Sequence, residues 1–173
     1  MLSQLSEVVL QFVLYYLPAF IANSTPTLVK GTHRIDFGRK FINGVDILGG
    51  GKTFEGLLYG LLSGYTLGLV ILYLAVIYSV SIPNILLPFL SVTGALLGDI
   101  IGAFVKRRMK IPRGASAPIL DQLDFVVGAT ILMRLVNTSI SVEVTVFSMI
   151  LALILHPITN KIAYILKLKD VPW

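Results

Sequence analysis

A chain of 173 residues in which 55% are hydrophobic and only 13% are charged does not have the composition of a soluble domain, where about a quarter of residues are charged. The length allows a single domain, residues 1–173, and the absence of cysteine excludes disulfides and thiolate metal sites. The net charge of +5 would suggest nucleic acid in a soluble protein, but its distribution here predicts a membrane topology and no nucleic-acid partner.

Apolar runs of the length that crosses a membrane divide the chain. A spanning helix needs roughly 20 mostly apolar residues. The runs are continuous and not alternating, which excludes a β-barrel, and no basic region precedes the first, so it is not a cleavable signal peptide. We therefore expect an all-α integral membrane protein, a single bundle of five transmembrane helices at residues 5–22, 54–79, 83–105, 122–137 and 144–166.

Two long polar loops, 23–52 and 106–121, separate these spans. They and the end of the last span contain 13 of the 14 basic residues, and Arg134 lies within a span. Because basic residues mark the cytoplasmic side of short loops, both loops and the C-terminus are expected in the cytoplasm and the N-terminus outside the cell. The excess positive charge is mainly a topology signal, and it also suits an anionic substrate.

The first loop has a polar segment at each end. Asn23-Ser24-Thr25-Pro26 either hydrogen-bonds a sugar or base, or only stops the first helix. Gly49-Gly50-Gly51-Lys52-Thr53 combines glycine amides, an ammonium group and the N-terminus of the next helix, a combination that favours an anion. It is not a Walker A loop, because Asp46 stands where that pattern needs glycine. A flexible turn with Thr53 as helix N-cap accounts for the same residues.

Glycines recur every four residues on the second and third spans. Such ridges let helix backbones approach closely, within one protomer or across a homodimer. On the third span the ridge would also hold Asp99 beside a closely packed neighbour. The residues are Gly56, Gly60, Gly64 and Gly68, and Gly94, Gly98 and Gly102.

Three carboxylates lie near the cytoplasmic ends of the third and fourth spans. Asp99 is one to two turns from the end of its helix, and Asp121 and Asp124 share one face at the start of the next. Ionisable groups at membrane depth are costly and indicate function. Converging carboxylates suit Mg²⁺ together with substrate phosphates. Two alternatives stay open, because acids in a first helical turn stabilise the helix and carboxylate groups also occur in ion transporters.

The second loop places cations between these acids. Lys106, Arg107 and Arg113 belong to a run of basic residues between the helix with Asp99 and the helix with Asp121. Cations that face acids in this way suggest a polyphosphate held between them, although the same run serves as a membrane anchor on the cytoplasmic side.

These motifs resemble a known family of enzymes. Gly98-Asp99, Lys106-Arg107, Lys110, Pro112, Asp121 and Asp124 are similar to the C-terminal signature of membrane CTP:phosphatidate cytidylyltransferases. The sequence departs from that signature at four places: Ala103 replaces a serine, Ile111 follows Lys110 in place of aspartate, Arg113-Gly114-Ala115-Ser116 stands in place of a Gly-His-Gly-Gly loop, and Gln122 replaces an arginine.

The departures point to a sister group, the CDP-archaeol synthase family, which the chain resembles over about residues 20 to 130. The segments that carry this resemblance are Asn23-Ser24-Thr25-Pro26, Asp36 with Gly38, Asp46 to Gly56, Gly98-Asp99 and Leu120 to Asp124. The resemblance implies a requirement for CTP and a divalent cation, and a lipid phosphate with geranylgeranyl ether chains as the second substrate.

Roles for individual residues follow from the motifs and the resemblance together. Asp99, Asp121 and Asp124 are the expected Mg²⁺ ligands, and with Lys52, Lys106 and Arg107 they form the expected catalytic set. The expected CTP-binding residues are Asn23, Thr25, Gly49, Gly50, Gly51, Lys52, Thr53, Lys106, Arg107 and Arg113.

The sequence thus predicts a multi-pass cytidylyltransferase of the cell membrane. The alternatives from other classes are an ion-coupled transporter that uses the same acids and a membrane scaffold assembled through the glycine ridges. Within the enzyme class, the alternative is CDP-diacylglycerol synthesis from an ester lipid.

Overall fold

The computed structural model describes residues 2–82, 84–112, 114–136 and 140–172. Its first helical run joins α1 (Leu2–Gln11), the π-helical turn η1 (Phe12–Tyr16), α2 (Leu17–Ser24) and the 3₁₀ turn η2 (Thr25–Leu28). The helices α3 (Phe54–Ile77), α4 (Leu87–Arg108), α5 (Leu120–Val136) and α6 (Val142–Ile165) follow. In the described part of the chain the fold is all-helical, and two isolated bridges, Arg34 with Thr53 and Lys40 with Asp46, shape the first loop.

Four of these helical segments are long and apolar enough to cross a membrane, as judged over the described residues: Gln4–Leu28, α3, α4 and α6. The expected fourth span, α5, is not among them. It is only 17 residues long and contains Asp121, Asp124 and Arg134. The chain is therefore a multi-pass helical membrane protein.

The helix ends differ from the expected ones where polar side chains extend a helix. The first run continues past residue 22 to Leu28, because Ser24 and Thr25 donate hydrogen bonds to the carbonyl of Ile21, at 3.0 and 3.1 Å. The third expected span begins at Pro83, which lies outside the described residues, and α4 begins at Leu87. At α3 the prediction of Thr53 as N-cap is confirmed, since its hydroxyl accepts from the Gly56 amide at 3.2 Å.

Both predicted glycine ridges pack inside this one chain. A Cβ on Gly60 would lie 2.8 Å from the carbonyl oxygen of Ala22, so α3 and α2 touch through their backbones. On α4, a Cβ at Gly94 would lie 2.8 Å from the Cα of Ala129 on α5. Gly128 on α5, which belongs to neither predicted ridge, faces Gly98 across the same contact. The ridges therefore no longer argue for a homodimer.

A buried hydroxyl cluster connects the first helical run to α5 and α6. Tyr16 is fully buried, and its hydroxyl lies 2.8 Å from that of Thr130 and 3.1 Å from that of Thr145. Buried polar groups need such partners, because an unsatisfied one costs about 1–3 kcal/mol. Phe12, Phe20 and Phe125 pack edge to face beside it.

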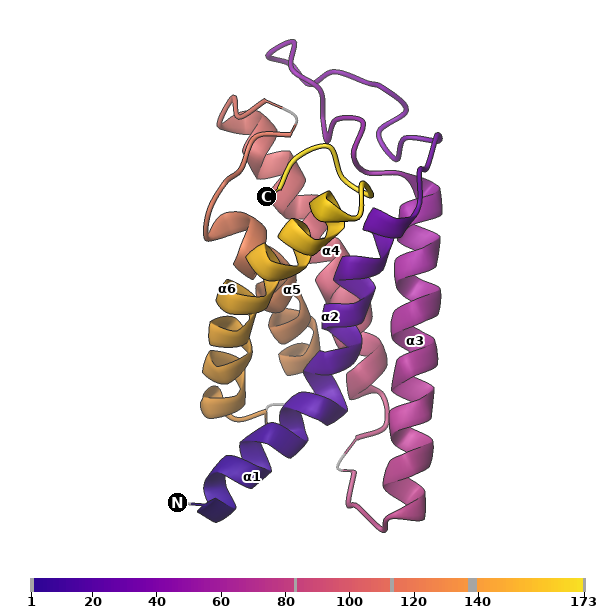
Figure 1. Cartoon of the computed structure of the whole chain (residues 1–173), viewed down its shortest axis with the longest axis vertical. Coiled ribbons are helices and arrows are strands. Elements are labelled where there is room, and N and C mark those ends of the chain that lie inside the picture. The colour runs from indigo at the N-terminus through magenta and orange to yellow at the C-terminus, as the bar shows by residue number, and fades with distance from the viewer. Residues whose placement is uncertain (1, 83, 113, 137–139, 173) are drawn as a thin grey trace.

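The bundle has a polar end and an apolar end. Both long loops and the C-terminal tail lie at one end, and the N-terminus lies at the other (Figure 1). The C-terminal half of α6 leans across the bundle toward α2 (Figure 1). Pro157 lies inside this helix and has no N–H to continue the hydrogen-bond ladder, which explains the bend.

Candidate functional site

A polar cavity of about 400 Å³ opens at the loop end of the bundle. Five of the predicted site residues line it, from the glycine-rich loop, the start of α3 and α4. They are Gly50, Gly51, Lys52, Thr53 and Asp99. Pro26 from η2 and Leu96 from α4 provide part of the apolar wall. The glycine-rich segment and the third-span acid, 47 residues apart in sequence, therefore meet at one cavity.

Lys52 and Asp99 form an ion pair across this cavity. The Lys52 ammonium donates to Asp99 Oδ2, and the exposed fractions of the two side chains are 25% and 27%. Lys52 follows the glycines and lies next to the Thr53 N-cap, so the start of α3 fixes its backbone. A partly buried pair of this kind offers both signs of charge to a ligand that enters the cavity.

Asp121 has two roles at once. Its carboxylate lies 2.8 Å from the Lys106 ammonium, and it accepts the backbone N–H of Ala117 at 2.9 Å, just before α5. The carboxylate thus holds the N–H of a residue that precedes α5 and pairs with a lysine in the last turn of α4. The pair joins the end of α4 to the start of α5.

Asp124 lies at the closest contact between α4 and α5. A Cβ on Gly102 would collide with the Asp124 carboxylate, so only glycine leaves space for that side chain. Its Oδ1 accepts from the Phe125 amide at 2.7 Å. The charges of Asp99, Lys52 and Asp121 all act on it, which places the three predicted carboxylates in one electrostatic neighbourhood.

The donor chemistry of this neighbourhood fits a hard divalent cation. Three carboxylates from two helices are oxygen ligands of the kind Mg²⁺ takes, and Mg²⁺ completes its shell with water and substrate phosphates. In the part of the chain that the structure describes, no three His, Cys, Asp or Glu side chains form a ready-made metal cluster. Two of the three acids are paired with lysines instead, so a cation there needs oxygens from the substrate.

The glycine-rich loop contains a backbone anion cradle, and Asp36 occupies it. One carboxylate oxygen accepts the amides of Leu48 and Gly49 at 3.0 Å each, and the other accepts that of Gly38 at 3.0 Å. Burial opposes ionisation of Asp36, but these N–H groups and Arg34 outweigh it, so the pKa of this carboxyl lies below its usual value. The Gly49 amide, predicted to bind CTP, is thus used to hold the loop.

Arg107 is a buried arginine beside that loop. Its side chain is 8% exposed, its Nη2 donates to the Pro112 carbonyl at 3.4 Å, and its buried Nε has no hydrogen-bond partner among the described residues. A Cβ on Gly49 would lie 3.8 Å from its Cδ. A buried guanidinium donor of this kind suits a phosphate oxygen. Arg113, the other predicted arginine, lies outside the described residues.

Arg108, next in sequence, anchors the first loop to α4. Its guanidinium stacks on the rings of Phe41 and Phe104, at 4.4 and 4.9 Å from their centres, and donates to the Asp46 carbonyl at 2.6 Å. These two neighbouring arginines therefore have different roles, because Arg108 fastens the loop and Arg107 approaches the glycine-rich segment.

The Asn23-Ser24-Thr25-Pro26 segment forms the end of α2 and the start of η2. The Thr25 hydroxyl lies 2.7 Å from that of Ser63 on α3, so it joins two helices. Asn23 is half-buried in the last turn of α2, and Pro26 lines the cavity. Of the two residues predicted here for CTP, Thr25 thus has a clear structural contact.

The C-terminal tail also borders the cavity, which the sequence motifs do not predict. Lys167, Leu168 and Asp170 line it together with the glycine-rich loop residues. In the sequence, the three lysines at the end of the chain indicate only topology. Pro157, at the bend of α6, is the feature of the sequence that could have pointed toward this arrangement.

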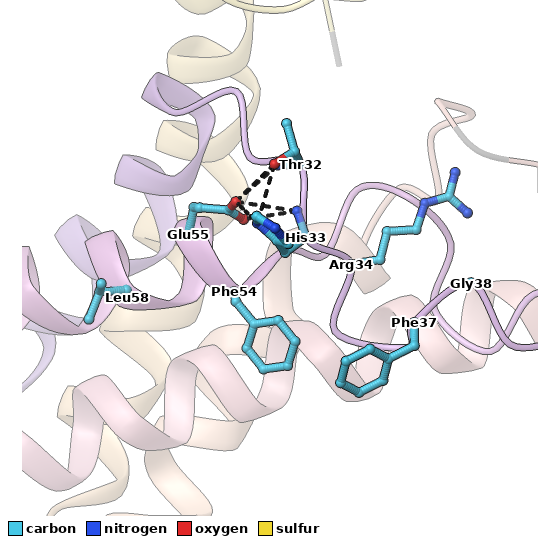
Figure 2. Close-up of a pocket in the computed structure, with 8 residues that line it drawn as sticks. All are labelled: Thr32, His33, Arg34, Phe37, Gly38, Phe54, Glu55 and Leu58. Carbon is cyan, nitrogen blue, oxygen red and sulfur yellow. Dashed lines mark hydrogen bonds and ion pairs between the residues drawn. The ribbon is translucent and has the colours of Figure 1, made fainter.

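A second, larger groove of about 760 Å³ lies nearby and contains none of the predicted site residues. Figure 2 shows the rings of Phe37 and Phe54 beside a hydrogen-bond network centred on Glu55. The Glu55 carboxylate accepts from the amide of Thr32 at 3.2 Å and lies 2.6 Å from Nδ1 of His33. Glu55 thus connects the first loop to α3, whereas Lys52 and Asp99 line the smaller cavity.

Comparison with known proteins extends this description. A family model described as CarS-like, CDP-archaeol synthase, matches residues 5–173. A CDP-archaeol synthase of Sulfolobus acidocaldarius is 45% identical over 161 residues, 93% of this chain and 96% of the relative. One from Sulfurisphaera tokodaii is 42% identical, over 93% of this chain and 94% of the relative.

A solved structure gives the same picture of the fold. It is described as an intramembrane enzyme for archaeal membrane lipids biosynthesis. Its TM-score is 0.74 at 38% identity, over 90% of this chain and 93% of that one. The likeness therefore extends along nearly the whole chain, beyond the segments that carry the motif resemblance.

Proposed function

The chain belongs to the CDP-archaeol synthase family, and on that premise we propose that it transfers CMP from CTP to an archaeal diether lipid phosphate. The products would be unsaturated CDP-archaeol and pyrophosphate. The protein is accordingly a membrane cytidylyltransferase of archaeal lipid synthesis. The observation that carries the site assignment is the cavity where the Lys52–Asp99 pair meets the glycine-rich loop.

In the proposed reaction an oxygen of the lipid phosphate attacks the α-phosphorus of CTP. A new P–O bond forms, the bond between the α-phosphorus and its bridging oxygen breaks, and pyrophosphate leaves. A phosphate nucleophile is already ionised near pH 7, so no strong general base is needed. The residues of the site therefore act by alignment and by neutralising charge.

Three cationic residues are assigned to the phosphates. Lys52, together with the amides of Gly50 and Gly51, would hold part of the triphosphate, because all three line the cavity. Lys106 and Arg107 would neutralise the rest, and the buried Nε of Arg107, which has no partner among the described residues, supports this role. The assignments of Asn23 and Thr53 to CTP rest on the sequence motifs, and that of Arg113 rests on the run of basic residues in the second loop.

The carboxylates of Asp99, Asp121 and Asp124 would hold Mg²⁺, which supplies charge neutralisation to phosphate oxygens when bound. In the structure, Lys52 forms an ion pair with Asp99, and Lys106 forms one with Asp121. Their ammonium groups would turn toward the phosphates as the nucleotide enters, which frees carboxylate oxygens. This exchange of partners would couple metal binding to nucleotide binding.

For the membrane arrangement we propose five spans in a single domain, with α5 as the short one. The N-terminus would lie outside the cell, and both loops and the tail would lie in the cytoplasm. Grouping of the loops and tail at one end supports this orientation (Figure 1). CTP would reach the cavity from the cytoplasm, and the prenyl chains would stay among the helices. A homodimer remains a prediction of the sequence.

The decisive test is pyrophosphate release by the purified protein in lipid, with CTP, Mg²⁺ and a geranylgeranyl diether glycerol phosphate. Asp124→Asn should lower turnover by a factor on the order of 100 or more, because a ligand for the phosphate-bound metal is lost. Its melting temperature should stay close to that of the unchanged protein. Asp46→Asn is the matched control, since the loop residue Asp46 does not line the cavity.

Near-normal activity of Asp124→Asn would overturn the metal assignment. Release of pyrophosphate with an ester lipid phosphate but not the ether lipid would favour the CDP-diacylglycerol alternative. The transporter and scaffold alternatives have no support among the relatives.

A further inference from the structure

The carboxylate of Glu55, in the first turn of α3, accepts hydrogen bonds from two neighbouring residues of the first loop. The amide and the hydroxyl of Thr32 both donate to its Oε1, at 3.2 Å each. The amide of His33 donates to Oε2 at 3.2 Å, and Nδ1 of that residue lies 2.6 Å from Oε1. Figure 2 shows these bonds meeting at one side chain. Glu55 therefore holds a loop segment 22 residues away in sequence.

The backbone beside these bonds forms a short two-stranded ribbon of residues 32–35 and 52–55. The Ile35 amide donates to the Lys52 carbonyl at 3.0 Å. The Phe54 amide donates to the His33 carbonyl at 2.9 Å, and an antiparallel bridge lies between the two bonds. The backbone of Lys52 is thus bonded directly to the loop segment, and Glu55 binds the same segment three residues later.

The ribbon lies between the polar cavity and the larger groove. Lys52 and Thr53 line the cavity, whereas His33, Phe54 and Glu55 line the groove. In the described part of the chain, Glu55 therefore belongs to the wall of the groove and not to that of the cavity. It acts on a ligand of the cavity only through the ribbon backbone that carries Lys52.

The ribbon has little freedom to shift relative to α3. A Cβ on Gly31 would collide with the Thr53 hydroxyl and lie 2.9 Å from Oε2 of Glu55, so the loop segment already touches the start of the helix. The hydrogen bonds to Glu55 prevent the segment from moving away. Together these contacts fix the backbone from which the Lys52 side chain reaches Asp99.

We propose that Glu55 is a positioning residue for Lys52 and, through Lys52, for the triphosphate of CTP. The inference rests on the proposed function, in which Lys52 holds part of the triphosphate. Glu55 acts without touching the nucleotide, because its hydrogen bonds keep the ribbon closed and the Lys52 ammonium at the cavity. A binding group that is already ordered costs less to immobilise, so loss of this order weakens binding of the ligand.

The first test compares Glu55→Asp with Glu55→Gln in the full-length protein in lipid. Glu55→Asp keeps an acid at the N-terminus of α3, where it stabilises the helix, but the side chain is one methylene shorter and no longer reaches the loop segment. Glu55→Gln keeps the length and an acceptor oxygen. We expect Glu55→Asp to raise the KM for CTP about tenfold, the order of one hydrogen bond to a charged group, and Glu55→Gln to raise it at most about threefold. The KM for the lipid phosphate should stay unchanged in both.

The second test asks whether the effect passes through Lys52. Calorimetry without the lipid phosphate measures CTP binding to Glu55→Asp, to Lys52→Ala and to the double variant. We expect Glu55→Asp to weaken CTP binding about tenfold alone and less than about twofold in the Lys52→Ala background, because residues that act through one contact are not additive.

A matched control makes the same change at another helix start. Glu143 lies in the first turn of α6, next to the N-cap Ser141. Glu143→Asp should leave CTP binding and both KM values unchanged. Hydrogen exchange of the Ile35 and Phe54 amides, which donate within the ribbon, should be faster in Glu55→Asp than in the unchanged protein. Glu55→Ala replaces Glu55→Asp if the latter does not reach a normal melting temperature in detergent.

An unchanged KM for CTP in Glu55→Asp would overturn the proposal. So would an equal loss of CTP affinity with and without the Lys52 side chain, or an equal rise in both KM values, since those patterns indicate a general structural role. Failure of the proposed function is seen separately, as absence of CTP-dependent pyrophosphate release by the unchanged protein.

Discussion

Individual acidic residues of similar appearance have different roles here because their partners differ. Asp36 accepts three backbone amides of its own loop, so it organises the backbone. Asp99 and Asp121 pair with lysines from other segments, so they can exchange those partners for a ligand. Three backbone amides occupy the Asp36 carboxylate, whereas a lysine side chain can move away from Asp99 or Asp121 and leave room for a ligand.

Replacement of Asp36 should loosen the first loop without unfolding the bundle. Asp36→Asn loses charge-assisted hydrogen bonds to backbone amides, and we expect a local cost of about 1–3 kcal/mol. Hydrogen exchange across residues 29–53 should become faster, and CTP-dependent activity should fall because Lys52 ends this loop. Exchange in the core helices should not change. Unchanged exchange at Leu48 and Gly49 would contradict the role of Asp36.

The same residue predicts a pH dependence of loop order. The pKa of Asp36 is lower in the folded loop than in the unfolded chain. Its contribution is therefore fully present above the ordinary carboxyl pKa and is lost as pH falls through the lower, folded value. Protection of this loop, which is the intrinsic exchange rate at each pH divided by the observed rate, should thus fall at acid pH in the unchanged protein, and Asp36→Asn should remove that fall. An identical acid response in both proteins would argue against it.

At the level of helices, the α4–α5 contact connects packing to chemistry. Gly98 and Gly128 bring the two backbones together, and Gly102 leaves space for the Asp124 carboxylate. The ridge on α3, by contrast, packs against the first helical run and α4. Glycines of the same spacing therefore serve packing on one helix and the position of a candidate ligand on another.

This difference can be tested with two alanine substitutions. Gly102→Ala puts a methyl group against the Asp124 carboxylate, so we expect a stability loss of about 1–3 kcal/mol and at least about tenfold lower activity. Gly68→Ala is the control, because its Cβ would lie 3.4 Å from Pro88, an ordinary contact. Melting temperature and turnover, measured for both, decide the matter. Equal activities would contradict a special role for Gly102.

For the whole molecule, charge is separated along the bundle axis. The long loops and the tail lie at one end (Figure 1), and these segments contain most of the basic residues and provide part of the cavity lining. An aqueous nucleotide and a membrane-bound lipid can meet only where the bundle touches both phases. The polar end satisfies that condition, and the apolar helix surfaces below it face lipid.

The absence of cysteine permits a direct test of orientation. Ile42→Cys places a thiol at a residue of the first loop that is 96% exposed, and Ser81→Cys places one in the exposed α3–α4 connection. A membrane-impermeant maleimide should label Ile42→Cys only in inverted vesicles and Ser81→Cys only in intact cells, if the loops are cytoplasmic. The reverse pattern would place the N-terminus in the cytoplasm.

The sequence by itself determined the membrane class, the family and several local features. Thr53 caps α3 and Pro157 lies at the bend of α6, because caps and bends depend on neighbouring residues along the chain. The motif resemblance to CDP-archaeol synthases is confirmed by relatives that match nearly the whole chain. Apolar runs and family motifs are properties of the sequence alone, so they can be recognised without the tertiary structure.

Only the tertiary structure decided which side chains meet. The pairing of Lys52 with Asp99, the use of the Gly49 amide by Asp36 and the place of Leu168 in the cavity wall all join segments separated along the chain. The facing pair Gly98 and Gly128 is a further example. Spacing along a chain predicts which face of one helix a residue occupies, whereas partners across helices depend on the packing of the whole bundle.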